Sequence, residues 1–163
     1  MRYILNKIEK QKLFGKIINL IGLPGSGKTS IAKKLKKIFQ ENRINVIHID
    51  GDDLRKVLSE FSVNLKTREK LTNIYIKLAL LLSNKDNVVL ISSVSLNRST
   101  DLIKNRKIRT FLIENNFIIK DKMKIKIRHE FFKKDFFLPK KIDKKILNGN
   151  LNNSCLAIIN YFS

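Results

Sequence analysis

The chain has 163 residues, of which 43% are hydrophobic and 29% are charged, and this is the size and composition of one folded domain. No apolar stretch approaches the roughly 20 residues that a membrane-spanning helix needs, and the single cysteine allows no disulfide within the chain. We therefore expect a cytoplasmic protein that does not associate with membranes.

The net charge of +20 arises mainly from lysines that are spread along the whole chain. A surface that binds nucleic acid or acidic lipid would explain it. A composition rich in lysine, isoleucine and asparagine, imposed by an AT-rich genome, would explain it as well. Specific phosphate and base contacts favour arginine, which lysine outnumbers here, so we favour the compositional explanation and do not expect nucleic acid as a partner.

Short apolar runs alternate with longer amphipathic ones, and this predicts alternating strands and helices around a mostly parallel sheet. After an N-terminal extension (1–14), we expect strands at 16–21, 45–49, 87–91 and 117–119. We expect helices at 28–40 and 67–83, from Ser99 or Thr100 toward Glu114, and from Ser154 to Phe162. Ligands bind at the carboxyl ends of parallel strands, so the loops after Ile21, Ile49 and Ile91 are the expected site.

The run Gly-Leu-Pro-Gly-Ser-Gly-Lys-Thr at 22–29 fits the Walker A pattern, G-x-x-x-x-G-K-[ST], at every fixed position. Its glycines let the backbone wrap a phosphate group, which the amides and the following helix N-terminus then bind. Lys28 is expected to reach the β- and γ-phosphates of ATP, and Thr29 to bind Mg²⁺. The predicted ATP-binding residues are Gly22, Leu23, Pro24, Gly25, Ser26, Gly27, Lys28, Thr29 and Ser30.

Carboxylates follow the second expected strand, in the run Asp50-Gly51-Asp52-Asp53-Leu54-Arg55. Many P-loop proteins carry a Walker B aspartate after the third strand, but here Ser92-Ser93 stands there. One carboxylate of the run can hold the metal or its water, another can accept a hydroxyl proton, and Arg55 can pair with an anionic acceptor. The alternative is a helix N-cap on a solvated surface, for which Asp53 alone would suffice. Neither His48 nor His129 belongs to a cluster suited to zinc, and we expect both to be structural or solvent-facing.

From about Gly15 to Asp101 the sequence resembles the adenylyl-sulfate kinase family, which transfers the γ-phosphoryl group of ATP to the 3′-hydroxyl of adenosine 5′-phosphosulfate. The resemblance rests on the Walker run, the Asp50–Arg55 run, Phe61-Ser62, Arg68 with Ala79 eleven residues later, and the run Ser-Ser-Val-Ser-Leu-Asn-Arg at 92–98. It implies catalysis by Lys28, Asp50, Asp52 and Ser95, and a metal held by Thr29 and Asp50. Acceptor contacts are implied for Asp52, Arg55, Phe61, Arg68, Ser93, Val94 and Ser95. Arg55 and Arg68 would hold the phosphosulfate end, Phe61 would stack on the base, and Ser95 would place a hydroxyl at the cleft. The resemblance also makes a homodimer reasonable.

The sequence departs from this family where the acceptor and the lid are expected. Leu71 stands in place of an acceptor-binding asparagine, and Leu96-Asn97 replaces the usual Pro-Tyr. In the possible lid region, 131–150, the run Lys-Lys-Asp-Phe-Phe at 133–137 is nearest to the family's lid sequence and lacks its glycine. Drift within a sulfate-activating enzyme would explain these changes. So would a different nucleotide acceptor, such as the cytidine diphosphoramidate used in surface-polysaccharide biosynthesis.

We therefore predict a single P-loop kinase domain over 1–163, with the α/β fold of a P-loop NTPase: a three-layer α/β/α sandwich of the nucleoside- and nucleotide-kinase type. ATP and Mg²⁺ are the expected cofactors, and a nucleotide is the expected acceptor. Two alternatives belong to other classes. One is a basic nucleic-acid-binding module that uses its P-loop as a switch, and the other is a non-catalytic relative that binds nucleotide and a partner protein.

Overall fold

One parallel sheet of five strands organises the chain. The computed structural model describes residues 5–60, 64–84, 86–94, 105–115, 139 and 141–163. The strands are β1 (Ile17–Ile21), β2 (Asn45–Asp50), β3 (Asn87–Ser93), β4 (Ile108–Glu114) and β5 (Lys144–Leu147). Their order in the sheet is β2-β3-β1-β4-β5, and every neighbouring pair is parallel. Because β1 is the middle strand, the loop that follows it opens over the centre of one sheet edge.

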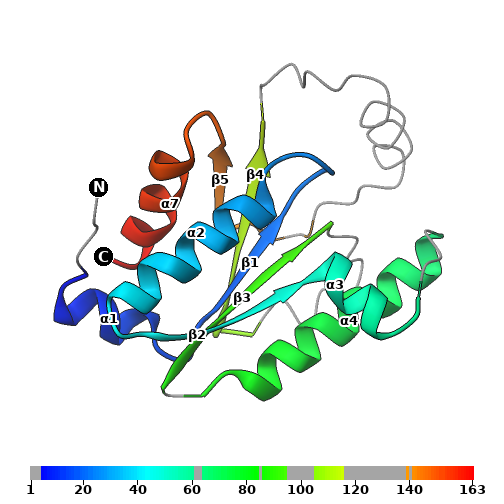
Figure 1. The fold of residues 1–163 in the computed structure, drawn as a ribbon, viewed down its shortest axis with the longest axis horizontal. Helices are drawn as coiled ribbons and strands as arrows, with labels where there is room; N and C mark the ends of the chain where they lie inside the picture. The colour runs from blue at the N-terminus through cyan, green and yellow to red at the C-terminus, as the bar shows by residue number, and fades with distance from the viewer. Residues whose placement is uncertain (1–4, 61–63, 85, 95–104, 116–138, 140) are drawn as a thin grey trace.

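Helices cover both faces of this sheet, as Figure 1 shows. They are α1 (Lys7–Leu13), α2 (Lys28–Glu41), α3 (Gly51–Val57), α4 (Leu65–Leu82) and α7 (Leu151–Ile159), followed by the 3-10 turn η1 (Asn160–Phe162). The pleat of β1 sends Ile18 and Leu20 into the core beneath α1, α2 and α7, and Ile17 into a second core beneath α4. This is the predicted three-layer arrangement.

Helix α2 forms because its sequence places a glycine at the turn before it and a regular apolar stripe along it. Gly27 precedes it in the left-handed conformation, with φ of 92°. Ile31, Leu35 and Ile38 then recur at helical spacing and are buried against the sheet, as predicted. The first turn of α2 is thereby fixed at the carboxyl end of β1.

The C-terminal third differs from the sequence prediction. The helix expected to run toward Glu114 is wrong over its second half, where β4 pairs in parallel with β1. The last helix is capped by Asn150, whose side chain accepts hydrogen bonds from two backbone N–H groups, and Ser154 lies buried inside it. The lid expected at 131–150 overlaps β5, so a lid could comprise only the residues before Lys144. The strand expected at 117–119 and most of the earlier lid residues lie outside the described residues.

Within the described ranges, no helix is both long enough and apolar enough to cross a membrane.

Candidate active site

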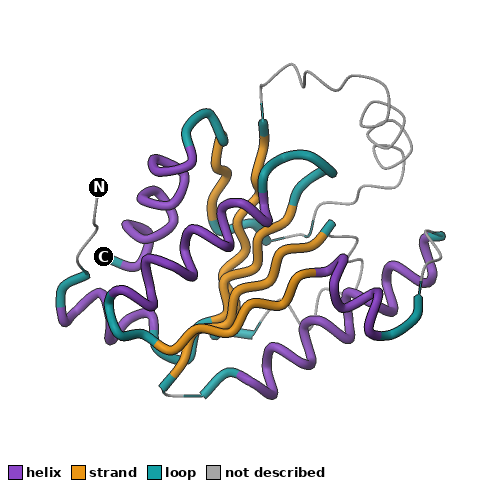
Figure 2. Tube along the Cα trace, viewed as in Figure 1, coloured by secondary structure: helices purple, strands orange, loops and turns teal. Residues whose placement is uncertain are grey.

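The Walker loop connects β1 to α2 at the carboxyl edge of the sheet, as the tube in Figure 2 shows. Gly22 leaves β1 with φ of 154°, and a Cβ there would meet the backbone oxygen of Ile113 in β4. Only glycine therefore fits between the two strands at this point. The backbone N–H of Ser26 donates to the carbonyl of Leu23 at 3.2 Å, which closes the loop before α2 begins.

Lys28 is folded back over this loop and is only 7% exposed. Its Nζ donates to the carbonyl oxygen of Leu23 at 2.7 Å and contacts Ser26 Oγ at 3.2 Å. Burial lowers the pKa of Lys28 to about 8, although the nearby Asp52 and Asp50 favour the charged form. An anion bound in the loop would offset this burial and stabilise the charged ammonium form of Lys28.

Asp50 joins three parts of the fold. Its Oδ2 accepts hydrogen bonds from Thr29 Oγ1 of α2 at 2.9 Å and from Ser92 Oγ of β3 at 2.8 Å. Its Oδ1 accepts from the backbone N–H of Asp52 at 3.0 Å. Burial would raise the pKa of Asp50, but the hydrogen bonds from Ser92, Thr29 and the Asp52 backbone outweigh it and hold the pKa below its ordinary value. The side chain is therefore a carboxylate at neutral pH.

The geometry bears on the alternative that the carboxylates of the Asp50–Arg55 run serve only as a helix N-cap on a solvated surface. Asp50, and not Asp53, is the N-cap of α3. The cap uses Oδ1 alone, while Oδ2 is directed toward the Walker threonine and β3. Capping therefore does not account for the whole environment of Asp50.

The turn from β2 into α3 is packed tightly against neighbouring elements. A Cβ on Gly51 would lie 3.2 Å from the Cβ of Ser93 and 3.3 Å from the carbonyl oxygen of Ser92. From the other side, the Tyr75 hydroxyl of α4 donates to the Gly51 carbonyl at 3.1 Å. Asp52 follows on this fixed backbone with its side chain exposed to solvent, where it can meet an acceptor.

The other predicted acceptor residues lie in different surroundings. Arg55 is half-buried on α3, and Arg68 is only 4% exposed near the start of α4. Ser93 is buried at the end of β3, and Val94 follows it half-buried. Phe61 and Ser95 lie outside the described residues.

Leu71, which replaces the expected acceptor-binding asparagine, is 3% exposed in the core between α4 and the sheet. An aliphatic side chain at this position adds to the core and offers no hydrogen bond to a ligand.

Two further side chains at the site were not predicted. His48, which was expected to be structural or solvent-facing, is half-buried, and its Nε2 lies 2.8 Å from Ser92 Oγ. Through Ser92 it is linked to the Asp50 carboxylate. Burial lowers the pKa of His48, although Asp50 favours the charged form. Asn148, between β5 and α7, donates from Nδ2 to the backbone oxygen of Ser26 at 3.0 Å, and Ser154 Oγ donates to its Oδ1 at 3.1 Å. No local pattern marks either contact, since each joins residues far apart in the chain.

The donor set suits Mg²⁺ better than a transition metal. The Thr29 hydroxyl and the Asp50 carboxylate are hard oxygen ligands, and Mg²⁺ commonly uses one or two carboxylates together with substrate phosphates. Among the described residues, no group of three or more His, Cys, Asp or Glu side chains could hold a metal ion without such a substrate. Thr29 and Asp50 therefore fit a metal that arrives with a nucleotide.

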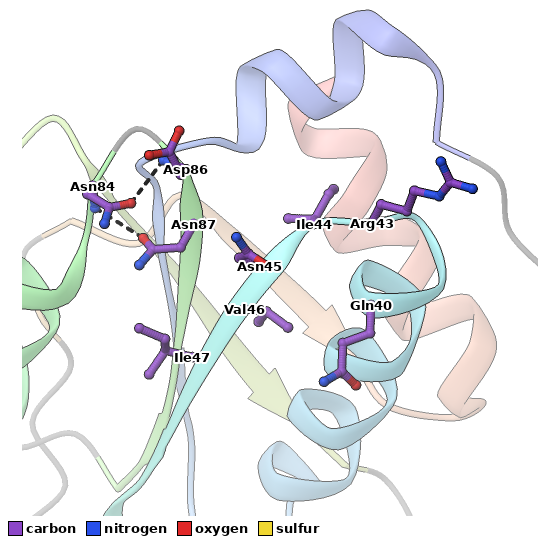
Figure 3. A pocket seen from close by; sticks show the side chains of 9 residues that line it. All are labelled: Gln40, Arg43, Ile44, Asn45, Val46, Ile47, Asn84, Asp86 and Asn87. Carbon is purple, nitrogen blue, oxygen red and sulfur yellow. Dashed lines mark hydrogen bonds between the residues drawn. The ribbon is translucent and has the colours of Figure 1, made fainter.

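A pocket of about 480 Å³ opens at the opposite end of the sheet, where β2 and β3 begin (Figure 3). Its polar rim is occupied by local turn contacts. The Asn84 backbone donates to Asn87 Oδ1 at 3.0 Å, and the Asp86 backbone donates to Asn84 Oδ1 at 2.9 Å. Because the pocket lies where β2 and β3 begin and the Walker loop follows the end of β1, the length of the sheet separates them. We assign the pocket no part in the chemistry.

The sequence matches the model of the adenylylsulphate kinase family over residues 14–130. A probable adenylyl-sulfate kinase of Aeropyrum pernix is 31% identical over 142 residues, which cover 85% of this chain and 73% of that protein. The cytidine diphosphoramidate kinase of Campylobacter jejuni is 32% identical over 80 residues, which cover 49% of this chain and 47% of that enzyme. The chain thus aligns with about half the length of that relative.

The fold has close counterparts among solved structures. The APS kinase CysC of Mycobacterium tuberculosis, solved in complex with AMPPNP and APS, superposes with a TM-score of 0.74 at 18% identity, covering 91% of this chain and 97% of that one. At this identity the likeness concerns the fold, and it confirms the predicted P-loop α/β architecture.

Proposed function

Because the chain belongs to the adenylyl-sulfate kinase family, we propose that it is an ATP-dependent kinase that phosphorylates the 3′-hydroxyl of adenosine 5′-phosphosulfate. The observation that carries this proposal is the bond between Thr29 and Asp50. It joins the Walker loop, which is suited to ATP, to the carboxylate run after β2, which is suited to an acceptor. This contact supports a site in which the donor and acceptor groups lie at one edge of the sheet.

The donor phosphates are bound by the loop and the start of α2. Backbone N–H groups of the loop and the positive end of α2 favour a polyphosphate. Lys28 already lies over the loop, and it exchanges the Leu23 carbonyl for a phosphate oxygen when the nucleotide binds. The lysine then neutralises charge that develops on the γ-phosphoryl group during transfer.

Thr29 and Asp50 are the residues that would hold Mg²⁺. The ion, when bound, neutralises phosphate charge during phosphoryl transfer. The low pKa of Asp50 keeps this side chain anionic over the whole neutral range. The Thr29 hydroxyl is held toward the same place by its bond to Asp50 Oδ2.

The acceptor side begins at Asp52. Its carboxylate is exposed on a backbone fixed through Gly51, so it is available to orient an acceptor hydroxyl and to take up its proton. Arg55, about one helical turn further along α3, supplies positive charge for the anionic part of the acceptor. Contacts from Phe61, Arg68 and Ser95 remain predictions, as does a homodimer.

Cytidine diphosphoramidate is the second candidate acceptor. The Campylobacter jejuni relative supports it, and the burial of Leu71 removes a contact expected for the first candidate. A position that binds the acceptor in the family is committed here to the hydrophobic core. Losing a hydrogen bond to a buried polar group costs about 1–3 kcal/mol, which is enough to change substrate preference. The Campylobacter jejuni relative is an enzyme named for that acceptor.

An acceptor screen tests the proposal. The purified protein is mixed with ATP, Mg²⁺ and one of adenosine 5′-phosphosulfate, cytidine diphosphoramidate, AMP or CMP. ADP release and the mass of the product are then measured. We expect acceptor-dependent ADP with adenosine 5′-phosphosulfate and a product one phosphoryl group heavier. Asp52→Asn is the matched control, because it keeps the shape of the side chain and removes the proton acceptor. If no acceptor stimulates ADP release, the proposed function is wrong.

A further inference from the structure

A line of hydrogen bonds runs from His48 to the Walker threonine. His48 Nε2 lies 2.8 Å from Ser92 Oγ, and Ser92 Oγ lies 2.8 Å from Asp50 Oδ2. The same carboxylate oxygen lies 2.9 Å from Thr29 Oγ1. The register of the sheet makes the line possible, because Asp50 of β2 pairs with Ser92 of β3. His48 lies two residues before Asp50, so both side chains emerge on the same face of β2.

The chemistry of these groups fixes the direction of each bond. The Asp50 carboxylate has no proton to give, so the hydroxyl groups of Ser92 and Thr29 both donate to it. The single proton of the Ser92 hydroxyl is donated to Asp50, so Ser92 has none to donate to His48. The bond between His48 and Ser92 therefore requires a proton on His48 Nε2, with the serine oxygen as acceptor.

This bond removes the rotational freedom of the Ser92 hydroxyl. A serine hydroxyl turns about its Cβ–Oγ bond and can donate in several directions. With His48 donating to the oxygen, the serine proton is left to point at Asp50. The carboxylate is then held by three donors from three elements: Thr29 of α2, Ser92 of β3 and the Asp52 backbone of α3.

We propose that His48, as its Nε2–H tautomer, is a positioning residue that acts through Ser92 to orient the Asp50 carboxylate for the metal–nucleotide complex. This inference rests on the proposed function for the identity of the ligand. Hydrogen-bond partners of ligating side chains commonly set metal affinity, and losing one costs about 10- to 100-fold in affinity or activity. His48 touches neither the metal nor the nucleotide in this assignment.

The first test reads the tautomer directly, without any ligand. The 163-residue protein is labelled with ¹⁵N-histidine, and its two imidazoles, His48 and His129, are observed by NMR. His48→Gln identifies the signals of His48. We expect a protonated Nε2 and an unprotonated Nδ1 in the wild-type protein, and loss of that preference in Ser92→Ala. Ser83→Ala is the matched control, because Ser83 is also buried and caps the end of α4, near the start of β3 and away from the Walker loop. A protonated Nδ1, or an equal mixture of tautomers in the wild type, would overturn the proposal.

The second test measures what the bond does for the metal. The affinity of the protein for AMPPNP is measured by calorimetry with and without Mg²⁺. We expect His48→Leu to reduce the gain in affinity that Mg²⁺ provides by up to the roughly 10-fold loss expected when the Ser92 bond itself is removed. The metal-free affinity should change little. His48→Gln keeps an N–H donor of similar reach and should restore most of the gain. His48→Leu combined with Ser92→Ala should be no worse than Ser92→Ala alone.

These outcomes separate the inference from the proposed function. Equal gains for the wild type, His48→Leu and His48→Gln would refute the positioning role, whichever acceptor is phosphorylated. Conversely, a failed acceptor screen leaves both the tautomer and the AMPPNP measurement interpretable. Should His48→Leu fold poorly, the wild-type NMR spectrum still decides the tautomer, and an undiminished gain in Ser92→Ala would refute the positioning role.

Discussion

The low pKa of Lys28 should make nucleotide binding take up protons. Burial lowers this pKa from 10.5 to about 8 in the ligand-free protein. Bound phosphates require the charged ammonium form, so every neutral Lys28 must gain a proton when the nucleotide binds. A pKa of 8 leaves about one tenth of the side chains neutral at pH 7, about half at pH 8 and about nine tenths at pH 9. The expected uptake is therefore about 0.1, 0.5 and 0.9 protons per nucleotide at these pH values.

The affinity should follow the same titration. As the pH rises above 8, the binding-competent form becomes scarcer, and the apparent Kd should rise toward about 10-fold per pH unit. Below pH 7 the lysine is already charged, so the affinity should depend little on its titration. The sign is fixed by the direction of the shift, because a lysine with an ordinary pKa would remain charged throughout this range.

Calorimetry of AMPPNP binding in the presence of Mg²⁺ measures both quantities. Titrations at pH 7, 8 and 9 are each made in two buffers with different ionisation enthalpies, and the difference in heat gives the number of protons taken up. Lys28→Arg is the matched control, since arginine keeps its charge beyond pH 12. This variant also measures the titration of the ligand itself. If the wild-type protein and Lys28→Arg take up the same number of protons on binding at pH 8 and 9, the reasoning about the buried ammonium group is refuted.

Three further predictions concern the backbone around the site. Gly22→Ala should cost more than about 3 kcal/mol of unfolding free energy, because its Cβ would meet a carbonyl of β4. Gly149→Ala, whose Cβ has open space, should change the unfolding free energy by less than about 0.5 kcal/mol. Similar urea midpoints for the two variants would contradict this contrast. Tyr75→Phe should lower the unfolding free energy by about 1 kcal/mol through the lost bond to Gly51, and an unchanged urea midpoint would speak against that bond. Asn148→Ala should weaken AMPPNP binding about 5-fold, because the Walker loop loses a side-chain donor worth about 1 kcal/mol. An unchanged Kd in calorimetry would show that this contact does not set the loop's affinity.

The Walker loop and its flanking elements could be predicted because their signals are local. Glycines at fixed spacing, a buried strand before them and an amphipathic helix after them specify one arrangement. The same holds for β2 and the carboxylates that follow it. The run at 108–114 was harder to assign from sequence, and the helix predicted toward Glu114 is wrong there. A short buried parallel strand and a buried helix segment share one hydrophobic pattern. The β-branched residues of this run, Ile108, Thr110 and Ile113, were the signal that favours a strand.

The contacts that complete the site could not be predicted, because they depend on tertiary register. His48 meets Ser92 only when β2 and β3 align in parallel with one particular offset. Asn148 reaches the Walker loop across 122 residues, from the end of a four-residue strand whose exposed lysines resemble a loop. The N-cap of α7 was placed four residues too late because Ser154 and Asn150 are both good capping residues.

The contact between Asn148 and the Walker loop ties nucleotide binding to the end of the chain. Asn148 is held by Ser154 of α7, and Cys155 and Ile158 of the same helix lie in the core cluster that contains α2. Local opening of α7 would remove a support of the phosphate loop, so a ligand that binds the closed form must suppress that opening. Backbone amides of α7 should consequently exchange their hydrogens more slowly when nucleotide is bound. Hydrogen exchange in α7 would thus respond to nucleotide binding at the Walker loop, although α7 itself supplies no predicted ligand contact.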